Sequence, residues 1–392
     1  MVLWTRWTPL TGTSPTAVDV DWLIATDAAL QDVAARGTLT TGPEQDHTVK
    51  VEASGLEPAT LYWYRFRAGD EASPVGRTRT APPPGGGVGS LRLGVVSCAS
   101  YPAGWFHAYR NLARRDVDFV VHVGDYLYEN GRHSHRGPRR PPVGTAVTLD
   151  GYRARYALYR TDADLRALHA RHPMVTVWDD HELAGGAWSG GAYEHVASRH
   201  GPWAERKAAA VQAYWEWMPA RRPDPADPER IYRLLRWGDL ADLAMLDTRL
   251  SGRDRPYGRG AGVVVRLSDP DPGRSMLGEA QRVWLEAEMT ASSTRWRVLG
   301  NQVMLAPSPL IAGRLLNSGQ WDGYPRERGW LHAMLSRAGG NAVVLSGDIH
   351  SSWANELPVG AEFVTPSVSS PAFAEILVPG GRLGAMAAER VF

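Results

Sequence analysis

Three hydrophobic segments that each end in potential metal ligands constrain this sequence most. Residues 119–123, Phe-Val-Val-His-Val, predict a buried β-strand, and a glycine then leads into Asp125 and Tyr128. The same pattern, an apolar segment followed by potential ligands, recurs where Asp-Asp-His-Glu follows residues 175–178 and where Gly-Asp-Ile-His follows residues 343–346. In open α/β sheets, ligands bind outside the carboxyl ends of strands. These three clusters therefore predict one functional site of the kind found in metal-dependent hydrolases.

Length and composition limit the number of domains and the classes of binding partner that this chain can have. A chain of 392 residues is long enough for about two domains. Its 43 basic and 42 acidic residues give no electrostatic argument for binding nucleic acid or an anionic membrane. No apolar run approaches the roughly 20 residues of a membrane-spanning helix, and the first residues lack the pattern of a signal peptide. One cysteine excludes an internal disulfide.

The sequence pattern changes at residues 83–89, which are rich in proline and glycine and predict a linker. Residues 1–82 contain short segments with period-two alternation, which predict a small all-β sandwich of the immunoglobulin or fibronectin type. Residues 90–392 alternate strands with helical stretches, which predicts an α/β catalytic domain. The expected helices cover residues 105–115, 152–171, 203–218, 277–291 and 330–338.

The first two polar clusters offer distinct ligands. A carboxylate such as Asp125 can bridge two cations, and the phenolate of Tyr128 suits a trivalent ion better than a soft divalent one. The alternative is that Asp125 caps a helix and Tyr128 packs. Cys98 ends the expected strand at residues 91–97, where a cysteine is commonly a small buried apolar residue. As a ligand it would supply a thiolate, and a nucleophilic role stays open.

The other two clusters add acid and imidazole groups. Asp180 could ligate a second metal, with His181 facing the substrate as a general acid or a phosphate donor. The alternative is a solvated helix N-terminus, where acidic residues are favoured. Asp348 and His350 stand at positions i and i+2, which point the same way in an extended chain and could reach one metal cluster. A turn with a structural histidine is the competing interpretation.

Taken together, these residues resemble a known family. Gly124-Asp125-x-x-Tyr128, Trp178-Asp179-Asp180-His181-Glu182 and Ser346-Gly347-Asp348-Ile349-His350, with Cys98 before them, resemble the motifs of the alkaline phosphatase D (PhoD-like) family. That family lies within the calcineurin-like metallophosphoesterase superfamily. The resemblance extends over nearly the whole chain and implies a four-layer α/β/β/α catalytic domain after the N-terminal sandwich.

The resemblance also implies a cofactor and a reaction. It places a ferric ion on Cys98, Asp125, Tyr128 and His350, and a calcium ion beside Asp125, with Asp348 and Asp180 on that side. Spacing alone also permits Zn²⁺ or Mn²⁺. Hydroxide on or between two metals roughly 4 Å apart would attack the phosphorus of a small phosphate ester, making the protein a phosphatase or phosphodiesterase. Relatives of this kind imply a monomeric periplasmic or secreted enzyme.

Some features depart from the family pattern, and two other functions stay open. Relatives often carry Asn shortly after the Asp-Asp-His-Glu block, where this chain has Gly185 and Gly186. The chain also lacks the export signal, the first strand and the closing strands usual in relatives, as a truncated version would. The alternative functions are a phospholipase D-type diesterase and a non-catalytic, metal-stabilised binding protein. The weaker site candidates are Arg249 (with an ion pair as the simpler role), Asn301, Gln302, His133 and His135.

Overall fold

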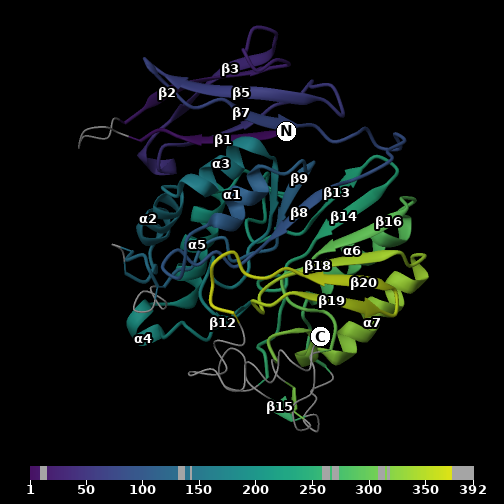
Figure 1. Ribbon diagram of the computed structural model, residues 1–392. Helices are drawn as coiled ribbons and strands as arrows, with labels where there is room; N and C mark the ends of the chain where they lie inside the picture. Colours follow the sequence, from purple (N-terminus) through teal and green to yellow (C-terminus); the bar gives the residue numbers. More distant parts are fainter. Residues whose placement is uncertain are drawn as a thin grey trace.

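The computed structural model has a mixed α/β fold (Figure 1). It describes residues 1–8, 16–130, 137–141, 144–257, 273–307 and 318–372, and the backbone of strands β15 (Val265–Arg266) and β17 (Arg314–Leu315). His133 and His135 lie outside the described residues. Within the described part of the chain, no helix combines the length and the apolar character needed to cross a membrane.

The N-terminal part is built from β-strands around a core of its own. One sheet has the order β3-β2-β5-β6 with β7 on β5, and β1 pairs with β4. Alternation explains the packing of β2, where Val20 and Ile24 are buried while Asp21 faces solvent and accepts a hydrogen bond from Thr38. The strands are β1 (Val2–Arg6), β2 (Val18–Ala25), β3 (Val33–Thr41), β4 (Thr48–Glu52), β5 (Leu61–Ala68), β6 (Glu71–Ala72) and β7 (Gly76–Arg79), and a short helix η1 (Pro43–Gln45) precedes β4. The immunoglobulin or fibronectin type stays a prediction.

Two further sheets form the rest of the molecule. A parallel three-stranded sheet has the order β10-β9-β8, and a mixed six-stranded sheet has the order β13-β14-β16-β18-β20-β19. Their strands are β8 (Leu93–Val96), β9 (Phe119–His122), β10 (Met174–Thr176), β13 (Arg233–Trp237), β14 (Ala241–Met245), β16 (Trp296–Gly300), β18 (Ala342–Ser346), β19 (Trp353–Leu357) and β20 (Gly360–Val364). The fully described stretch between β7 and β8 contains neither helix nor strand, as the prolines and glycines of residues 83–89 predict.

Both faces of the six-stranded sheet are buried, in two different cores. In β14, Leu243 and Met245 join the core that also contains the three-stranded sheet, whereas Ala244 joins a second core. The first core includes residues of α1 (His107–Ala113), α2 (Leu149–Tyr159), α3 (Ala163–Arg171) and α5 (Trp203–Trp217), and the second includes residues of α6 (Gly278–Ala291) and α7 (Pro325–Arg337). Figure 1 shows these two groups of helices on opposite sides of the sheets. The four-layer order stays a prediction.

The expected helix at residues 152–171 is wrong in one respect, because the structure has two helices there. α2 ends at Tyr159, and α3 begins at Ala163. Asp162 has extended backbone angles, and its carboxylate accepts hydrogen bonds from the backbone N–H groups of Asp164 and Leu165. This side-chain cap starts a new helix and interrupts what hydrophobic periodicity alone treats as continuous. The remaining short elements are β11 (Ala187–Trp188), β12 (Gly191–Ala192), α4 (Ala197–His200) and η2 (Trp321–Gly323).

Candidate metal centre

The candidate ligands converge from the carboxyl ends of strands in two different sheets. Those that follow β8, β9 and β10 come from adjacent strands of the three-stranded sheet, and those that follow β18 come from the six-stranded sheet. The segments that follow β8 and β18 meet at Gly347, where an added Cβ would lie 2.6 Å from Oγ of Ser97. The backbone N–H of Val368 also donates to the Ser97 carbonyl at 2.9 Å. A side chain at residue 347 would therefore push the two halves of the site apart.

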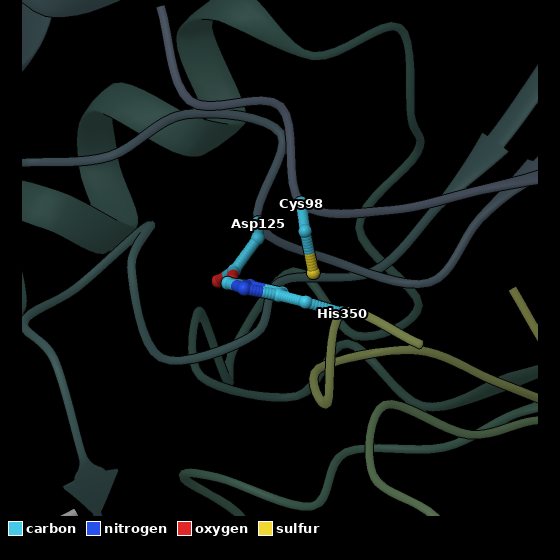
Figure 2. Close-up of side chains that lie close together, drawn as sticks. All are labelled: Cys98, Asp125 and His350. Atoms are coloured by element: carbon cyan, nitrogen blue, oxygen red, sulfur yellow. The ribbon is translucent and has the colours of Figure 1, made fainter. Parts of the chain in front are cut away.

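Cys98, Asp125 and His350 form the first group of ligands. One ligand atom of each lies within 4.8 Å of the other two, and Figure 2 shows the three side chains pointing toward one another. Nδ1 of His350 donates to the Pro371 carbonyl at 2.8 Å, which leaves Nε2 facing the cluster with its lone pair. The hydroxyl of Tyr128 lies 3.0 Å from this Nε2. The structure thus brings all four residues of the expected ferric site together.

The backbone of this site is strained at the ligands themselves. Cys98, Asp125, Asp348 and His350 have φ values of 58°, 54°, 64° and 54°, in the left-handed region. Non-glycine residues rarely adopt such angles, at a cost on the order of 1–3 kcal/mol each, and they concentrate at functional sites. Each of these residues follows a parallel strand closely, so the left-handed angle turns the chain sharply where the strand ends.

Asp180 and His181 join Asp125 in a second group, and Asp179, Asp180 and Asp348 form a third. The third group already has a cation, the buried guanidinium of Arg249. Its Nε donates to Asp179 and its Nη2 donates to Asp348 at 2.6 Å, with Asp180 at 3.4 Å. The structure therefore shows the ion pair expected for Arg249. Proximity to Asp180 and Asp348 also places this guanidinium at the cluster that would receive a second metal.

The donor set fits a bound cation. Burial raises the pKa of Asp125 well above its ordinary value, against the attraction of His181, and neighbouring carboxylates raise it further. Burial, followed by the charge of Asp125, raises the pKa of the Cys98 thiol in the same way. Oδ2 of Asp179 is buried and accepts no hydrogen bond from any described residue. A cation would stabilise the ionised forms of these groups. A buried, protonated thiol is also a poor nucleophile, which disfavours that role for Cys98.

Comparison with known proteins gives the family of this chain. Residues 93–388 match the family model described as PhoD-like phosphatase, and residues 1–82 match that of the PhoD-like phosphatase N-terminal domain. The chain belongs to the PhoD-like phosphatase family. Alkaline phosphatase D of Bacillus subtilis (strain 168) is 37% identical over 94% of this chain and 67% of its own length. A solved structure titled "Structure of PhoD" matches with a TM-score of 0.88 and 37% identity, covering 94% of this chain and 74% of that one.

Family membership makes this PhoD-like phosphatase a phosphoric ester hydrolase. The non-catalytic binding protein that the sequence left open therefore loses its support. The family resemblance expected from the motifs is confirmed.

Two buried glutamates organise the site of this phosphatase: Glu182, which the sequence motif contains without indicating its role, and Glu129, which no motif indicates. The Glu182 carboxylate accepts hydrogen bonds from the backbone N–H groups of Asp125, Tyr126 and Asp179 at 3.0, 2.6 and 2.8 Å. It thereby fastens the turn after β9 to the turn after β10. Burial raises its pKa to about 7, although these hydrogen bonds oppose the rise. The sequence showed Glu182 beside His181 but gave no sign of its partners across the sheet.

Glu129 is the second glutamate, and it holds His181. Because an ionised carboxylate can only accept, Nδ1 of His181 donates to Oε2 of Glu129, at 2.7 Å. The other oxygen accepts from the backbone N–H of Gly185 at 2.9 Å. Burial by itself would raise the Glu129 pKa, but His181 and these hydrogen bonds hold it below its ordinary value. The ring of Tyr128 stacks on His181 with centroids 4.0 Å apart.

The remaining candidates have mainly structural contacts. The backbone N–H groups of Gly185 and Gly186 donate to Glu129 and Asp180, so glycines at these positions still supply polar groups to the site. The Gln302 side chain donates to the carbonyls of Trp178 and Leu246 and so links the two sheets. Asn301 donates to Ser346 at 3.1 Å. These bonds give Asn301 and Gln302 a role in joining strand ends.

Proposed function

We propose that this PhoD-like phosphatase hydrolyses small phosphate esters at a metal centre between its two catalytic sheets. The observation that carries the proposal is the buried convergence of Cys98, Asp125 and His350, with Tyr128 at 3.0 Å from the histidine. A thiolate, a carboxylate, a phenolate and an imidazole are a donor set for a transition metal and not for magnesium. The position of this cluster at strand carboxyl ends is the usual place for an α/β active site.

The resemblance of the motifs favours Fe³⁺ at Cys98, Asp125, Tyr128 and His350, because a phenolate is a hard anionic donor. It favours Ca²⁺ on the side of Asp180 and Asp348, where the available donors are carboxylate oxygens. Zn²⁺ or Mn²⁺ are the alternatives. Bound cations would supply Lewis acidity and an activated water nucleophile.

The protein's own residues would orient and protonate the substrate. His181 is held through Nδ1 by Glu129, which leaves Nε2 as the proton donor for the leaving oxygen of the ester. The Arg249 guanidinium, already between carboxylates, carries N–H donors suited to phosphate oxygens. A water nucleophile and an acid of this kind require no covalent intermediate on the protein.

We also propose three features of the whole molecule that follow from the family. Residues 1–82 form a sandwich domain, residues 83–89 a linker and residues 90–392 a catalytic domain whose two sheets lie between two layers of helices. The enzyme acts as a monomer in the periplasm or outside the cell. The two separate cores on the faces of the six-stranded sheet support the layered arrangement.

The decisive experiment combines metal analysis with activity. Iron, calcium, zinc and manganese are measured in the purified protein, and p-nitrophenyl phosphate and bis-p-nitrophenyl phosphate are assayed before and after chelation. Asp125→Ala and His350→Ala are compared with Asp70→Ala, whose carboxylate is fully exposed. We expect chelation and both site variants to abolish turnover, and Asp70→Ala to leave it unchanged.

The outcome also separates the two remaining reactions. Faster hydrolysis of the diester than of the monoester would favour a diesterase, either the general phosphodiesterase or the phospholipase D-type alternative, over a phosphomonoesterase. Full activity in metal-free protein, or near-normal activity in either site variant, would defeat the assignment of the metal centre.

A further inference from the structure

A cavity of about 450 Å³ lies between the N-terminal strands and the edges of the two catalytic sheets. Residues of β1, β5 and β7 line it on one side, and residues of β10 and β13 line it on the other. β10 and β13 are the first strands in the order of their sheets, so the cavity lies where two sheet edges meet the N-terminal part. It contains none of the candidate metal ligands.

The charge of this cavity is one-sided. Among the described residues, its lining includes no aspartate or glutamate but six arginines: Arg77, Arg79, Arg160, Arg221, Arg222 and Arg233. The whole chain is nearly balanced, with 43 basic and 42 acidic residues. The neighbouring cavity of about 820 Å³ shows the usual mixture, because Glu44, Glu52, Glu216 and Glu229 line it together with basic residues. The excess of positive charge is therefore specific to the smaller cavity.

Four of the six arginines pair with no carboxylate in the part of the chain that the structure describes. Arg79 pairs with Asp118 at 2.6 Å, and Arg221 pairs with Glu52 at 2.7 Å. Among the described residues, no ion pair is formed by the other four, which are Arg77, Arg160, Arg222 and Arg233. Like charges gathered in this way repel one another unless an anion lies between them.

Backbone carbonyls and aromatic rings hold these arginines in place. Arg233 donates to the carbonyls of Ile231 at 3.0 Å and Thr176 at 2.7 Å, and Arg77 donates to that of Arg171 at 3.2 Å. A guanidinium has five N–H donors, so these bonds fix each group and leave further donors for a ligand.

Arg160 is held in a similar way. Its guanidinium lies 4.4 Å from the centre of the Trp4 ring and donates to the Trp217 carbonyl at 2.9 Å. The same guanidinium lies 5.4 Å from the centre of the Tyr126 ring. These contacts hold the Arg160 guanidinium at the wall of the cavity.

We propose that this arginine-lined cavity binds a phosphate-bearing anion at a site separate from the metal centre. Planar guanidinium groups match the geometry of phosphate oxygens and bind them with charge-assisted hydrogen bonds. The volume is within the range of small-molecule sites and exceeds what a single phosphate group needs. The ligand is inorganic phosphate or a small organic phosphate, and Trp4 and Tyr64 in the lining offer ring surfaces to the latter.

The test measures binding of inorganic phosphate and of AMP by calorimetry in the Asp125→Asn background, because an active metal centre would itself bind phosphate and hydrolyse AMP. Arg77→Gln/Arg222→Gln removes two of the four arginines that pair with no described carboxylate. Arg166→Gln, an exposed arginine of α3 outside the cavity, is the matched control. Asp125→Asn disables the metal centre and leaves the cavity intact. Thermal unfolding of every variant verifies that it is folded.

We expect Asp125→Asn, alone or combined with Arg166→Gln, to bind anions at one site. Adding Arg77→Gln/Arg222→Gln to Asp125→Asn should weaken binding at that site at least about tenfold, as loss of a charge-assisted hydrogen bond predicts. Tighter binding of AMP than of phosphate would identify an organic phosphate as the ligand, and equal or weaker binding would identify the free anion. The proposal is overturned if Asp125→Asn binds neither anion, or if adding Arg77→Gln/Arg222→Gln to Asp125→Asn leaves the binding of both anions unchanged. Neither result bears on turnover at the metal centre, so the two proposals fail independently.

Discussion

Nδ1 of His181 donates a 2.7 Å hydrogen bond to Oε2 of Glu129, and the Glu129 side chain is completely buried. This pair fixes the ring orientation of His181 and keeps the proton on Nδ1. The carboxylate is itself fixed by the backbone of Gly185, so the orientation of the histidine depends on contacts among three separate positions.

Glu129→Gln tests whether this pair positions a catalytic acid. The amide keeps the shape but loses the charge that favours a protonated imidazole, so we expect kcat to fall roughly 10²-fold, within the range for acid–base catalysis. The alkaline limb of the pH–kcat profile should move to lower pH, while KM changes little. The control is Glu205→Gln, an exposed glutamate of α5. An unaltered pH profile would remove Glu129 from this role.

Tyr128→Phe tests the phenolate ligand. The Tyr128 hydroxyl lies 3.0 Å from Nε2 of His350, so its removal should abolish any visible absorbance from tyrosinate-to-iron charge transfer and lower the iron content. Tyr126→Phe is the matched control, because the Tyr126 hydroxyl lies 2.9 Å from Nε2 of His169, which is not one of the candidate ligands. A spectrum in Tyr128→Phe equal to that of the wild type would show that Tyr128 is not a ligand.

Gly124→Ala tests the close approach of two strand ends. Gly124 has a φ of 111°, and a Cβ there would lie 2.3 Å from Cβ of Asp179 and 2.7 Å from its backbone nitrogen. We expect a loss of about 2 kcal/mol or more in the free energy of unfolding, because backbone must move, and a large loss of activity. Gly339→Ala is the control: its φ of 99° is close to that of Gly124, and a Cβ there would meet only an ordinary contact at 3.6 Å from Nη2 of Arg297, so it measures the backbone cost without the clash. Equal stability of the two variants would contradict the steric argument.

His122→Gln tests a dependence of stability on pH. Burial lowers the pKa of His122 to about 3, while its unfolded value is near 6.5. Between these values the unfolded state binds the extra proton, so stability falls as the pH drops from 6.5 toward 3. The loss from this residue is about 2 kcal/mol at pH 5. Gln keeps a donor for Tyr109 and an acceptor for Gly124.

Denaturant unfolding at pH 7 and pH 5 measures this effect. We expect the decrease between the two pH values to shrink in His122→Gln and to stay as in the wild type in His107→Gln, an exposed histidine of α1. If all three proteins lose the same free energy between pH 7 and pH 5, His122 is not the group responsible.

Several features of the fold follow from local sequence alone. The runs that become β9, β10 and β18 are short and apolar and end in glycine or carboxylate residues, so their existence and their ends are predictable from side-chain chemistry. The ends of a helix are harder to predict where they depend on the hydrogen bonds of a single side chain. The break between α2 and α3 depends on Asp162 accepting two backbone hydrogen bonds, which periodicity does not register.

The side chains available for chemistry can be read from the amino-acid sequence, because they all follow predictable strands: Cys98, Asp125, Tyr128, Asp180, His181, Asp348 and His350. That these strands belong to two sheets whose carboxyl ends meet is visible only in the folded protein. Contacts between residues far apart in the chain, such as Gly347 with Ser97 and Glu129 with His181, bring the ligands together. The arginine-lined cavity also depends on tertiary packing, because its residues come from seven or more separate segments of the chain. Packing of the N-terminal strands against the catalytic sheets brings their positive charges close together.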